Sequence, residues 1–318
     1  MKTLRKILQI CIFFWFEIFL LLLCIFAFSP RAFAQQLYEV EKNGNSAFLI
    51  ASSHTSMSNE NQLPDWIFKK IKKSQLLCTE SKPLLPDDAY AQYVAIATNN
   101  NSTVLDVFEN EKTYRYKAID LITDSLKIKD DNIRNDFYKF SSYFLTDVLL
   151  TIYDFKLPFS AGKSVDQLLI DKFSALGLDV NCYMESYYEA ISPGQNVSLA
   201  GGYSYLKYAI NLIEDKSIFN AYRDYLSQMQ QAYTSDVSEK LCEIERRYNE
   251  KNNLKEIQSV TIDSRSQIFS LRIMRLIEGK KTPTIAIGAL HFCGTNSVLN
   301  LLRINGFRVE KLGPVNNQ

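Results

Sequence analysis

The sequence predicts an α/β fold, in which a mixed, largely parallel sheet is built from both termini and flanked by helices. Strand–helix–strand patterns occur near both ends of the chain, in residues 37–80 and 261–312. Residues 86–260 between them have mainly helical patterns. Because consecutive elements usually lie near one another, we expect the two ends to complete one sheet and the helical block to cap it.

The first strands are marked by alternation and by a turn signal. Residues 37–41 alternate between apolar and polar side chains, and residues 47–51 form the continuous apolar run of a buried strand. Asn43-Gly44 between them is a strong signal for a hairpin turn. Pro64 then opens a helix with one apolar face, and residues 75–79 form another buried strand.

The later elements are predicted in the same way. One strand, at residues 178–184, is expected inside the helical block, and it follows Gly177, a residue typical of a helix end. Near the C-terminus, residues 284–288 form a buried strand and residues 307–312 an alternating last strand. Apolar residues recur at helical spacing in these further stretches: 87 onward, 132–155, 165–175, 203–213, 218–248, 264–277 and 295–302.

The N-terminal segment, residues 1–34, has the order of a secretory signal peptide. Lys2, Arg5 and Lys6 give a basic start, residues 7–28 are almost all apolar, and Ala32-Phe33-Ala34 offers a small-residue cleavage site. We therefore expect an exported protein that is periplasmic or secreted after cleavage near Ala34. The apolar stretch is long enough to span a membrane, so a retained anchor is the alternative.

Residues 35–318 are expected to form one domain, with residues 86–260 as a mainly helical insertion or cap. The chain has 36 basic and 35 acidic residues, a balance that gives no basic surface for nucleic acid or anionic lipid. The predicted partners are a peptide or small-molecule substrate, with no nucleic acid and no membrane contact beyond the export signal. The sequence does not indicate an oligomeric state.

Four cysteines remain after the export signal: Cys78, Cys182, Cys242 and Cys293. Two disulfides are possible in an oxidising compartment, with three connectivities, and buried free thiols are the alternative. The sequence has no C-x-x-C pair, so neither a zinc ribbon nor a thioredoxin-type redox motif is predicted.

The chain contains two histidines, and each follows a predicted strand. His54 follows the apolar run that ends at Ala51, and His291 follows the run that ends at Gly288. Glu80 ends a third strand in the same way. The carboxyl ends of parallel strands form the usual ligand edge of an α/β sheet, so these three side chains would converge there. Two histidines and a carboxylate are the ligand set of a catalytic divalent ion, and manganese, zinc, cobalt or iron would suit them.

The alternative for each histidine is an ordinary core or surface position, because two histidines so far apart in sequence form no motif by spacing. The sequences H-E-x-x-H and G-x-S-x-G, the P-loop and G-x-G-x-x-G are all absent. The common zincin, serine hydrolase and nucleotide-binding classes therefore have no support.

Several segments resemble the TraB/GumN family. The resemblance rests on Phe48–His54, Glu80, Ile287–Gly294 and the closing Leu301–Val309, and residues 162–186 are similar to the family's central helix and strand. It covers the whole chain after the export signal. The family is related to the TIKI proteins, described as metal-dependent proteases built on two Gly-x-x-His motifs. The resemblance therefore implies a metal-dependent hydrolase, and a peptidase in particular.

The resemblance also assigns individual residues. His54 and His291 match the two motif histidines, and Glu80 matches the acidic residue after the first helix. Together they would hold the ion. Glu185 matches the acidic residue of the central segment and is expected as a general base or as a partner that orients a histidine. Arg265 matches the family's arginine and would stabilise an oxyanion or bind a substrate carboxylate; an ion pair with Glu185 is the structural alternative.

Two positions depart from the family pattern. Ala51 replaces the glycine of the first motif, which is a mild change where the backbone angle is ordinary, and Ser266 replaces an asparagine next to the arginine. Ser266 puts in question the contact that the amide makes, and with it catalytic activity. The wider superfamily includes erythromycin-esterase-like enzymes, which activate water with His and Glu, and haem-binding lipoproteins. Metal-independent hydrolysis and ligand binding without turnover are therefore the two alternative functions.

Overall fold

The computed structural model describes residues 36–53, 63–82, 87–98, 109–154, 163–234, 238–279 and 282–313. These residues belong to one compact unit. The predicted export signal and His54 lie outside the described residues. Among the helices of the described part, none combines the length and apolar character needed to cross a membrane.

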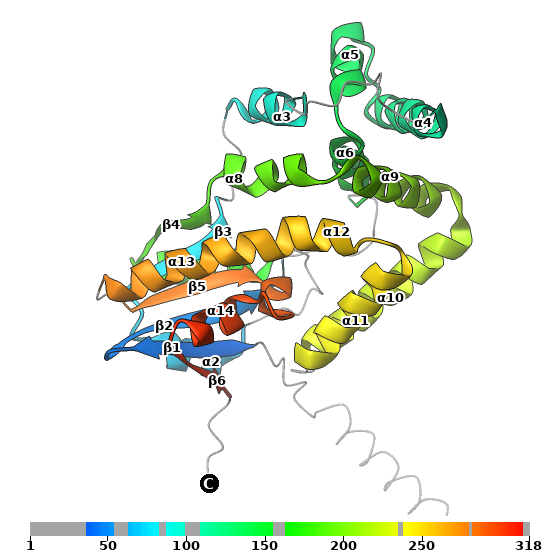
Figure 1. Cartoon of the computed structure of the whole chain (residues 1–318). Coiled ribbons are helices and arrows are strands. Elements are labelled where there is room, and N and C mark those ends of the chain that lie inside the picture. The colour runs from blue at the N-terminus through cyan, green and yellow to red at the C-terminus, as the bar shows by residue number, and fades with distance from the viewer. Residues whose placement is uncertain are drawn as a thin grey trace, which may run out of the picture. The chain divides into compact units, whose positions relative to one another are not determined.

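A six-stranded mixed sheet forms the centre of the fold, as the sequence predicts. Its strands are β1 (Leu37–Lys42), β2 (Asn45–Ser52), β3 (Leu76–Ser81), β4 (Asp179–Glu185), β5 (Pro283–Gly288) and β6 (Arg308–Leu312), in the order β4-β3-β5-β2-β1-β6. The pairs β4–β3, β3–β5 and β5–β2 are parallel, whereas β1 pairs antiparallel with both β2 and β6. Strands from both ends of the chain therefore meet in one largely parallel sheet (Figure 1).

The hairpin between β1 and β2 forms where the sequence predicts it. Lys42 pairs with Asn45, so that only two residues form the loop. Asn43 has a φ of 55° and Gly44 a φ of 80°. Two consecutive positive φ values define the type I′ turn that suits the twist of a hairpin, which explains the Asn-Gly signal.

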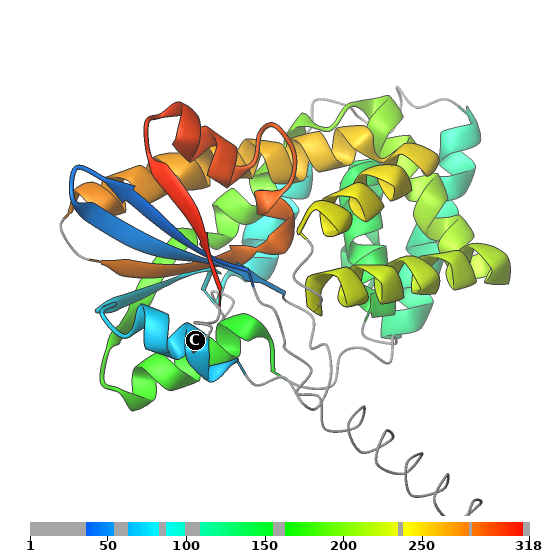
Figure 2. The ribbon, with the colours of Figure 1, turned by 90° about the horizontal axis from the view of Figure 1, so that it is seen from below.

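Helices cover both faces of the sheet (Figure 2). On one face, Phe269, Ile273 and Leu302 are fully buried against the strands. On the other face, Ile67 and Leu169 are fully buried against β2 and β3. The first face carries α13 (Ser264–Glu278) and α14 (Val298–Ile304), and the second carries α2 (Asp65–Ile71) and α7 (Val165–Ala175). Burial of each such side chain contributes about 1.5–3 kcal/mol, and this holds the helices that carry the candidate site.

A helical block with its own apolar core follows β3 and resumes after β4. Its centre contains Phe140, Phe144, Leu206 and Ile210, all nearly inaccessible to solvent. The helices of this part of the chain are α3 (Ala89–Thr98), α4 (Glu109–Leu126), α5 (Asp131–Lys139), α6 (Ser142–Asp154), α8 (Tyr187–Ile191), η2 (Ser192–Asn196), α9 (Leu199–Glu214), α10 (Lys216–Thr234), α11 (Ser238–Lys251) and α12 (Lys255–Gln258).

Two stretches predicted as single helices are each divided in the structure. The helix predicted over 132–155 breaks at Phe140, whose ψ of 146° is extended. Arg115 donates hydrogen bonds to the carbonyl oxygens of Tyr138 at 3.2 Å and Phe140 at 2.5 Å, and it thereby satisfies the end of α5. The stretch 218–248 is likewise divided into α10 and α11, which pack side by side. At Phe140, the contact with the distant Arg115 outweighs the local apolar pattern.

A long helical segment leads from the helical block to the sheet. It runs through α12, the π-helical turn η3 (Ser259–Asp263) and α13 without interruption (Figure 1). π-Helical turns are rare in proteins, and those that do occur are often found at functional sites. This turn directly precedes Ser264-Arg265-Ser266, which includes a predicted site residue and a position that departs from the family pattern.

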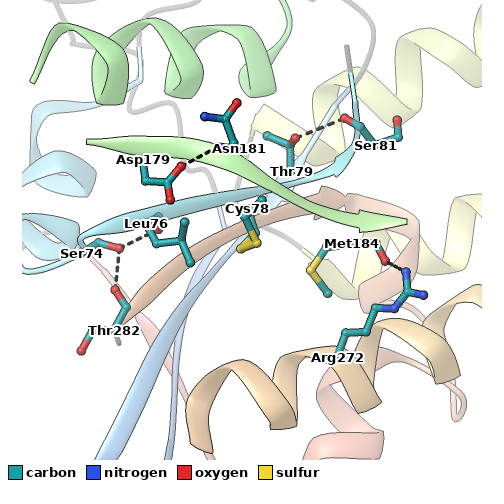
Figure 3. Close-up of a disulfide and its surroundings, with 11 residues drawn as sticks. Ser74, Leu76, Cys78, Thr79, Ser81, Asp179, Asn181, Met184, Arg272 and Thr282 are labelled. Carbon is teal, nitrogen blue, oxygen red and sulfur yellow. Dashed lines mark hydrogen bonds between the residues drawn. A yellow bond between two sulfur atoms is a disulfide. The ribbon is translucent and has the colours of Figure 1, made fainter. Parts of the chain in front are cut away.

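Two disulfides form among the four cysteines. Cys78 on β3 is bonded to Cys182 on the neighbouring β4, as Figure 3 shows. Cys242 on α11 is bonded to Cys293, which directly follows the short helix η4 (Ala289–Phe292) after β5. The second disulfide ties the helical block to the chain segment that carries His291.

Candidate metal centre

The carboxyl ends of three parallel strands meet at one edge of the sheet. β5 is the middle strand, with β2 on one side and β3 on the other. Ser52 pairs with Gly288, and Thr79 pairs with Ala286, so the residues that follow these pairs lie at the same level. The predicted convergence of strand ends is therefore present for Glu80 and His291. His54, which comes directly after the last described residue of this segment, lies outside the described part of the chain.

Glu80 is a buried carboxylate, only 5% exposed, with both oxygens in use. The backbone N–H of Gly288 donates to Oε2 at 2.6 Å. Arg265 donates to Oε1 from its Nη2 atom. These two contacts fix the carboxylate at the end of β3 and hold Oε1 on the side that faces His291.

His291 lies on the short helix η4 (Ala289–Phe292) that follows β5, and it is 2% exposed. Its Nε2 atom is 3.7 Å from Oε1 of Glu80. Its Nδ1 atom is 2.8 Å from the hydroxyl oxygen of Ser266. The ring of Phe269 packs edge-on against the imidazole, with the ring centres 4.8 Å apart. The imidazole is thus held on both sides by residues of α13.

The Ser266 hydroxyl determines which nitrogen of His291 carries the proton. Ser266 donates its single hydroxyl hydrogen to the carbonyl oxygen of Ile262 at 2.9 Å. Its oxygen can therefore only accept from His291, which assigns the proton to Nδ1. The lone pair of the neutral ring then lies on Nε2, the nitrogen that faces Glu80. A metal-binding histidine is typically oriented in this way, by a hydrogen bond from its other nitrogen.

Arg265 joins two carboxylates in the same part of the site. It donates to both oxygens of Glu185, including a bond of 2.9 Å from Nε to Oε2, and it also contacts Glu80. Burial raises the pKa of Glu185, and the hydrogen bonds and charge of Arg265 oppose that rise. Burial alone would lower the pKa of Arg265, but Glu185 and Glu80 together hold it above its ordinary value. Arg265 is therefore a fixed cation between two buried anions.

A small cavity of about 150 Å³ opens beside Glu80. Its walls come from the end of β3 and from the first turn of α7, where Asp166 contributes a further acidic side chain. The backbone N–H of Val165 donates to the carbonyl oxygen of Ser53 at 3.4 Å, so α7 begins next to the end of β2. Polar groups of β3 and of the start of α7 therefore border this cavity, and the end of β2 lies next to the start of α7.

The sequence match to a protein family covers nearly all of this architecture. The family model for the TraB/PrgY/gumN family matches residues 36–311. The chain belongs to this family. Neither the curated proteins nor the solved structures yield a match to the chain.

The two departures of this TraB/PrgY/gumN chain from the family pattern have different consequences. Ala51 lies inside β2, paired with Ile287, and its carbonyl oxygen accepts a hydrogen bond from Tyr233 at 2.8 Å. It therefore occupies ordinary strand backbone, where alanine is tolerated. Ser266 makes the 2.8 Å contact with His291 described above. A polar partner for the histidine is therefore present although the asparagine is not.

The structure brings together four of the five predicted site residues: Glu80, Glu185, Arg265 and His291. The interpretation of Glu185 and Arg265 as an ion pair is the one that matches their contacts. The orienting role of Ser266 was not anticipated from the sequence, since only its difference from asparagine was visible. Its one sequence signal was its position next to the arginine.

A metal ion requires ligand atoms at a defined separation. Two ligand atoms that each lie about 2.1 Å from one ion are separated by about 3–4 Å. The 3.7 Å between Nε2 of His291 and Oε1 of Glu80 meets this requirement. Within the described residues, no group of three His, Cys, Asp or Glu side chains could complete a site. His54 is the residue from which the sequence predicts the third ligand.

Proposed function

We propose that this chain is an exported metal-dependent hydrolase whose substrates are peptides. The observation that carries the proposal is the His291–Glu80 pair, in which Nε2 of the imidazole lies 3.7 Å from a carboxylate oxygen. The resemblance to the TraB/GumN family, which implies a relationship to metal-dependent proteases, supports the same proposal.

The charges of the site favour a divalent cation. Glu80 and Glu185 contribute two negative charges and Arg265 one positive charge, all in buried positions. These three side chains together carry one net negative charge beside the imidazole of His291, and a cation bound there would be attracted to it. His54, Glu80 and His291 are the residues that would hold the ion. When bound, it would supply an acidified water and would polarise a scissile carbonyl group.

The protein's own residues would perform the remaining tasks. Ser266 holds the imidazole of His291 in the tautomer that leaves Nε2 free of hydrogen. Arg265 fixes the position of Glu80, and its positive charge limits the electrostatic repulsion between Glu80 and Glu185. The sequence predicts Glu185 as a general base or as a partner that orients a histidine, but its bidentate bond to Arg265 favours a role in positioning that arginine.

The two disulfides support the exported location. Cys78–Cys182 and Cys242–Cys293 use all four cysteines outside the predicted signal peptide. Stable disulfides are typical of oxidising compartments and rare in the cytoplasm. Together with the signal-like N-terminal sequence, they favour a periplasmic or secreted protein.

A metal-independent hydrolase is the second candidate function, and one observation favours it. His291 and Glu80 already lie close enough for a single water molecule to contact both Nε2 and Oε1. Such a pair could activate water directly, as the erythromycin-esterase-like interpretation of the sequence requires.

One set of variants distinguishes the functions. The protein is purified without chelator, and its metal content and its hydrolysis of a fluorogenic peptide panel and of p-nitrophenyl acetate are measured for wild type, His54→Ala and His291→Ala. Glu250→Gln, an exposed carboxylate on α11, is the control for general charge effects. The proposal predicts one bound ion that is lost, together with peptide hydrolysis, in both histidine variants but retained in the control.

Other outcomes separate the alternatives. Full activity of metal-free protein would support direct activation of water by His291 and Glu80. An absence of hydrolysis, combined with tight binding of a ligand such as haem, would support a binding module without turnover. A bound ion that survives both histidine substitutions would contradict the proposed centre.

A further inference from the structure

A second cavity lies in the helical block, and it differs in character from the space beside Glu80. Its volume is about 560 Å³, enough for a small organic molecule. It lies between the C-terminal half of α6, the end of α9 and the start of α10. Apolar and aromatic side chains dominate its walls, among them Leu150, Ile213, Phe219 and Tyr222. Two carboxylates, those of Asp147 and Glu214, are part of the lining.

Asp147 is partly buried and has few partners. Its Oδ2 atom accepts a hydrogen bond from the hydroxyl of Tyr93 at 2.9 Å. Its Oδ1 atom accepts no side-chain hydrogen bond within the described part of the chain, and no described lysine or arginine lies within salt-bridge distance of it. Burial raises the pKa of Asp147, while the bond from Tyr93 acts to lower it. The cavity therefore contains a desolvated acid group that lacks a cation among the described residues.

The other charges of this cavity do not compensate for Asp147. Glu214 and Lys216 both line it, but both are exposed. Glu214 forms an ion pair with Lys117 at 2.5 Å. Lys216 stands at the first position of α10 and makes no salt bridge with Asp147. Within the described part of the chain, the rim thus carries the positive charge of Lys216, whereas the interior has acidic and aromatic character.

We propose that this cavity binds an organic ammonium ion with an apolar body. The ammonium group would form an ion pair with Asp147, and the faces of Phe219 and Tyr222 would attract the positive charge. Leu150 and Ile213 would contact the apolar body. This site does not depend on the proposed hydrolase centre, because it shares no lining residue with the cavity beside Glu80.

Three probes of the same shape and different charge test the proposal. Calorimetry measures the binding of 4-phenylbutylamine, 4-phenylbutan-1-ol and 4-phenylbutyrate to the whole protein. The amine is expected to bind about tenfold or more tightly than the alcohol, as a charge-assisted bond in a desolvated site requires, and the acid is expected not to bind. Equal binding of amine and alcohol, or no binding of the amine, would overturn the proposal without any variant.

Two variants test whether Asp147 is the group that causes the preference for the amine over the alcohol. Asp147→Asn keeps the shape of the side chain and removes its charge, so the preference for the amine should fall to about one. Glu214→Gln, which removes the other acidic group of the same lining, is the control and should keep the preference. A preference that persists in Asp147→Asn but disappears in Glu214→Gln would assign the binding to the rim and contradict the proposal.

The folding of Asp147→Asn can be checked independently. Because burial raises the pKa of Asp147, the ionised group lowers the stability of the folded state once the pH exceeds the ordinary pKa of an aspartate. The melting temperature of Asp147→Asn at neutral pH should therefore equal or exceed that of the wild type. A large fall would show that Asp147 stabilises the fold in its charged form, which is incompatible with a carboxylate reserved for a ligand.

Discussion

Replacement of Arg265 by methionine should destabilise the protein strongly, because it would leave two buried carboxylates without their cation. The side chains of Arg265, Glu80 and Glu185 are 14%, 7% and 3% exposed. Removal of one member from a buried ion pair typically costs about 3–5 kcal/mol. At about 2–4 °C for each kcal/mol in a chain of this size class, the melting temperature should fall on the order of 10 °C.

The assay is urea denaturation followed by circular dichroism, in buffer with a chelator so that bound ions do not contribute to stability. Arg246→Met is the matched control, since its side chain is 59% exposed and its partner Glu250 is 37% exposed. That surface pair should contribute only about 0.3–0.5 kcal/mol. Arg265→Met combined with Glu80→Gln and Glu185→Gln should regain much of the lost stability, because no unpaired charge then remains.

A loss below about 1 kcal/mol in Arg265→Met, similar to that of the control, would refute this reasoning. It would mean that both carboxylates take up protons or reach water without the arginine. Failure of the triple variant to regain stability would instead show that packing of the Arg265 side chain, rather than its charge, holds the site.

Three further predictions concern the surroundings of the site. Ser266→Ala should lower the affinity for a divalent ion about 10–100-fold with little change in melting temperature, as measured by competition with a chromophoric chelator; unchanged affinity would argue against the assigned tautomer. Replacement of Cys242 and Cys293 by serine should cost about 4 kcal/mol in the chain-entropy model for a loop of 51 residues, as measured by denaturation against the wild type under oxidising conditions. Hydrogen bonds from Arg272 and from the backbone of Ser186 lower the pKa of Glu189 to about 2. The stability that Glu189 contributes is thus present above its ordinary pKa and lost as the pH falls toward about 2, so the difference in unfolding free energy between wild type and Glu189→Gln should narrow over that range.

The sheet could be predicted from the sequence because its signals are local. Residues 47–51 are a continuous apolar run, residues 285–287 are Ile-Ala-Ile, and the Asn43-Gly44 turn sets the register of the hairpin. The apolar runs are typical of strands that are buried on both faces, and the Asn-Gly pair is typical of a turn with positive φ angles. Each of these signals lies within a few consecutive residues. Because the strands could be predicted, the positions of Glu80 and His291 at the strand ends could be predicted as well.

The helical block was harder to divide because its breaks depend on distant residues. The end of α5 at Phe140 is stabilised by Arg115, which belongs to the preceding helix α4. The disulfide pairing could not be predicted from the sequence either, because Cys78 and Cys182 come together only through the pairing of β3 with β4. No pattern within one element contains that information.

The details of the site depended on geometry that spacing does not reveal. Ser266 reaches His291 from a helix that begins after a π-helical turn, and its hydroxyl also contacts Ile262. The sequence showed only that an asparagine of the family was replaced. Likewise, nothing in the sequence around Asp147 distinguished it from an exposed acidic residue of a helix.

The central claim is that the carboxyl ends of β2, β3 and β5 hold one divalent ion, and anomalous diffraction from crystals of the Mn²⁺-loaded protein tests it most directly. The account predicts a single anomalous peak about 2.0–2.3 Å from Nε2 of His291 and from a carboxylate oxygen of Glu80, with an imidazole nitrogen of His54 as the third ligand. A peak elsewhere, or an imidazole of His54 far from that of His291, would contradict it.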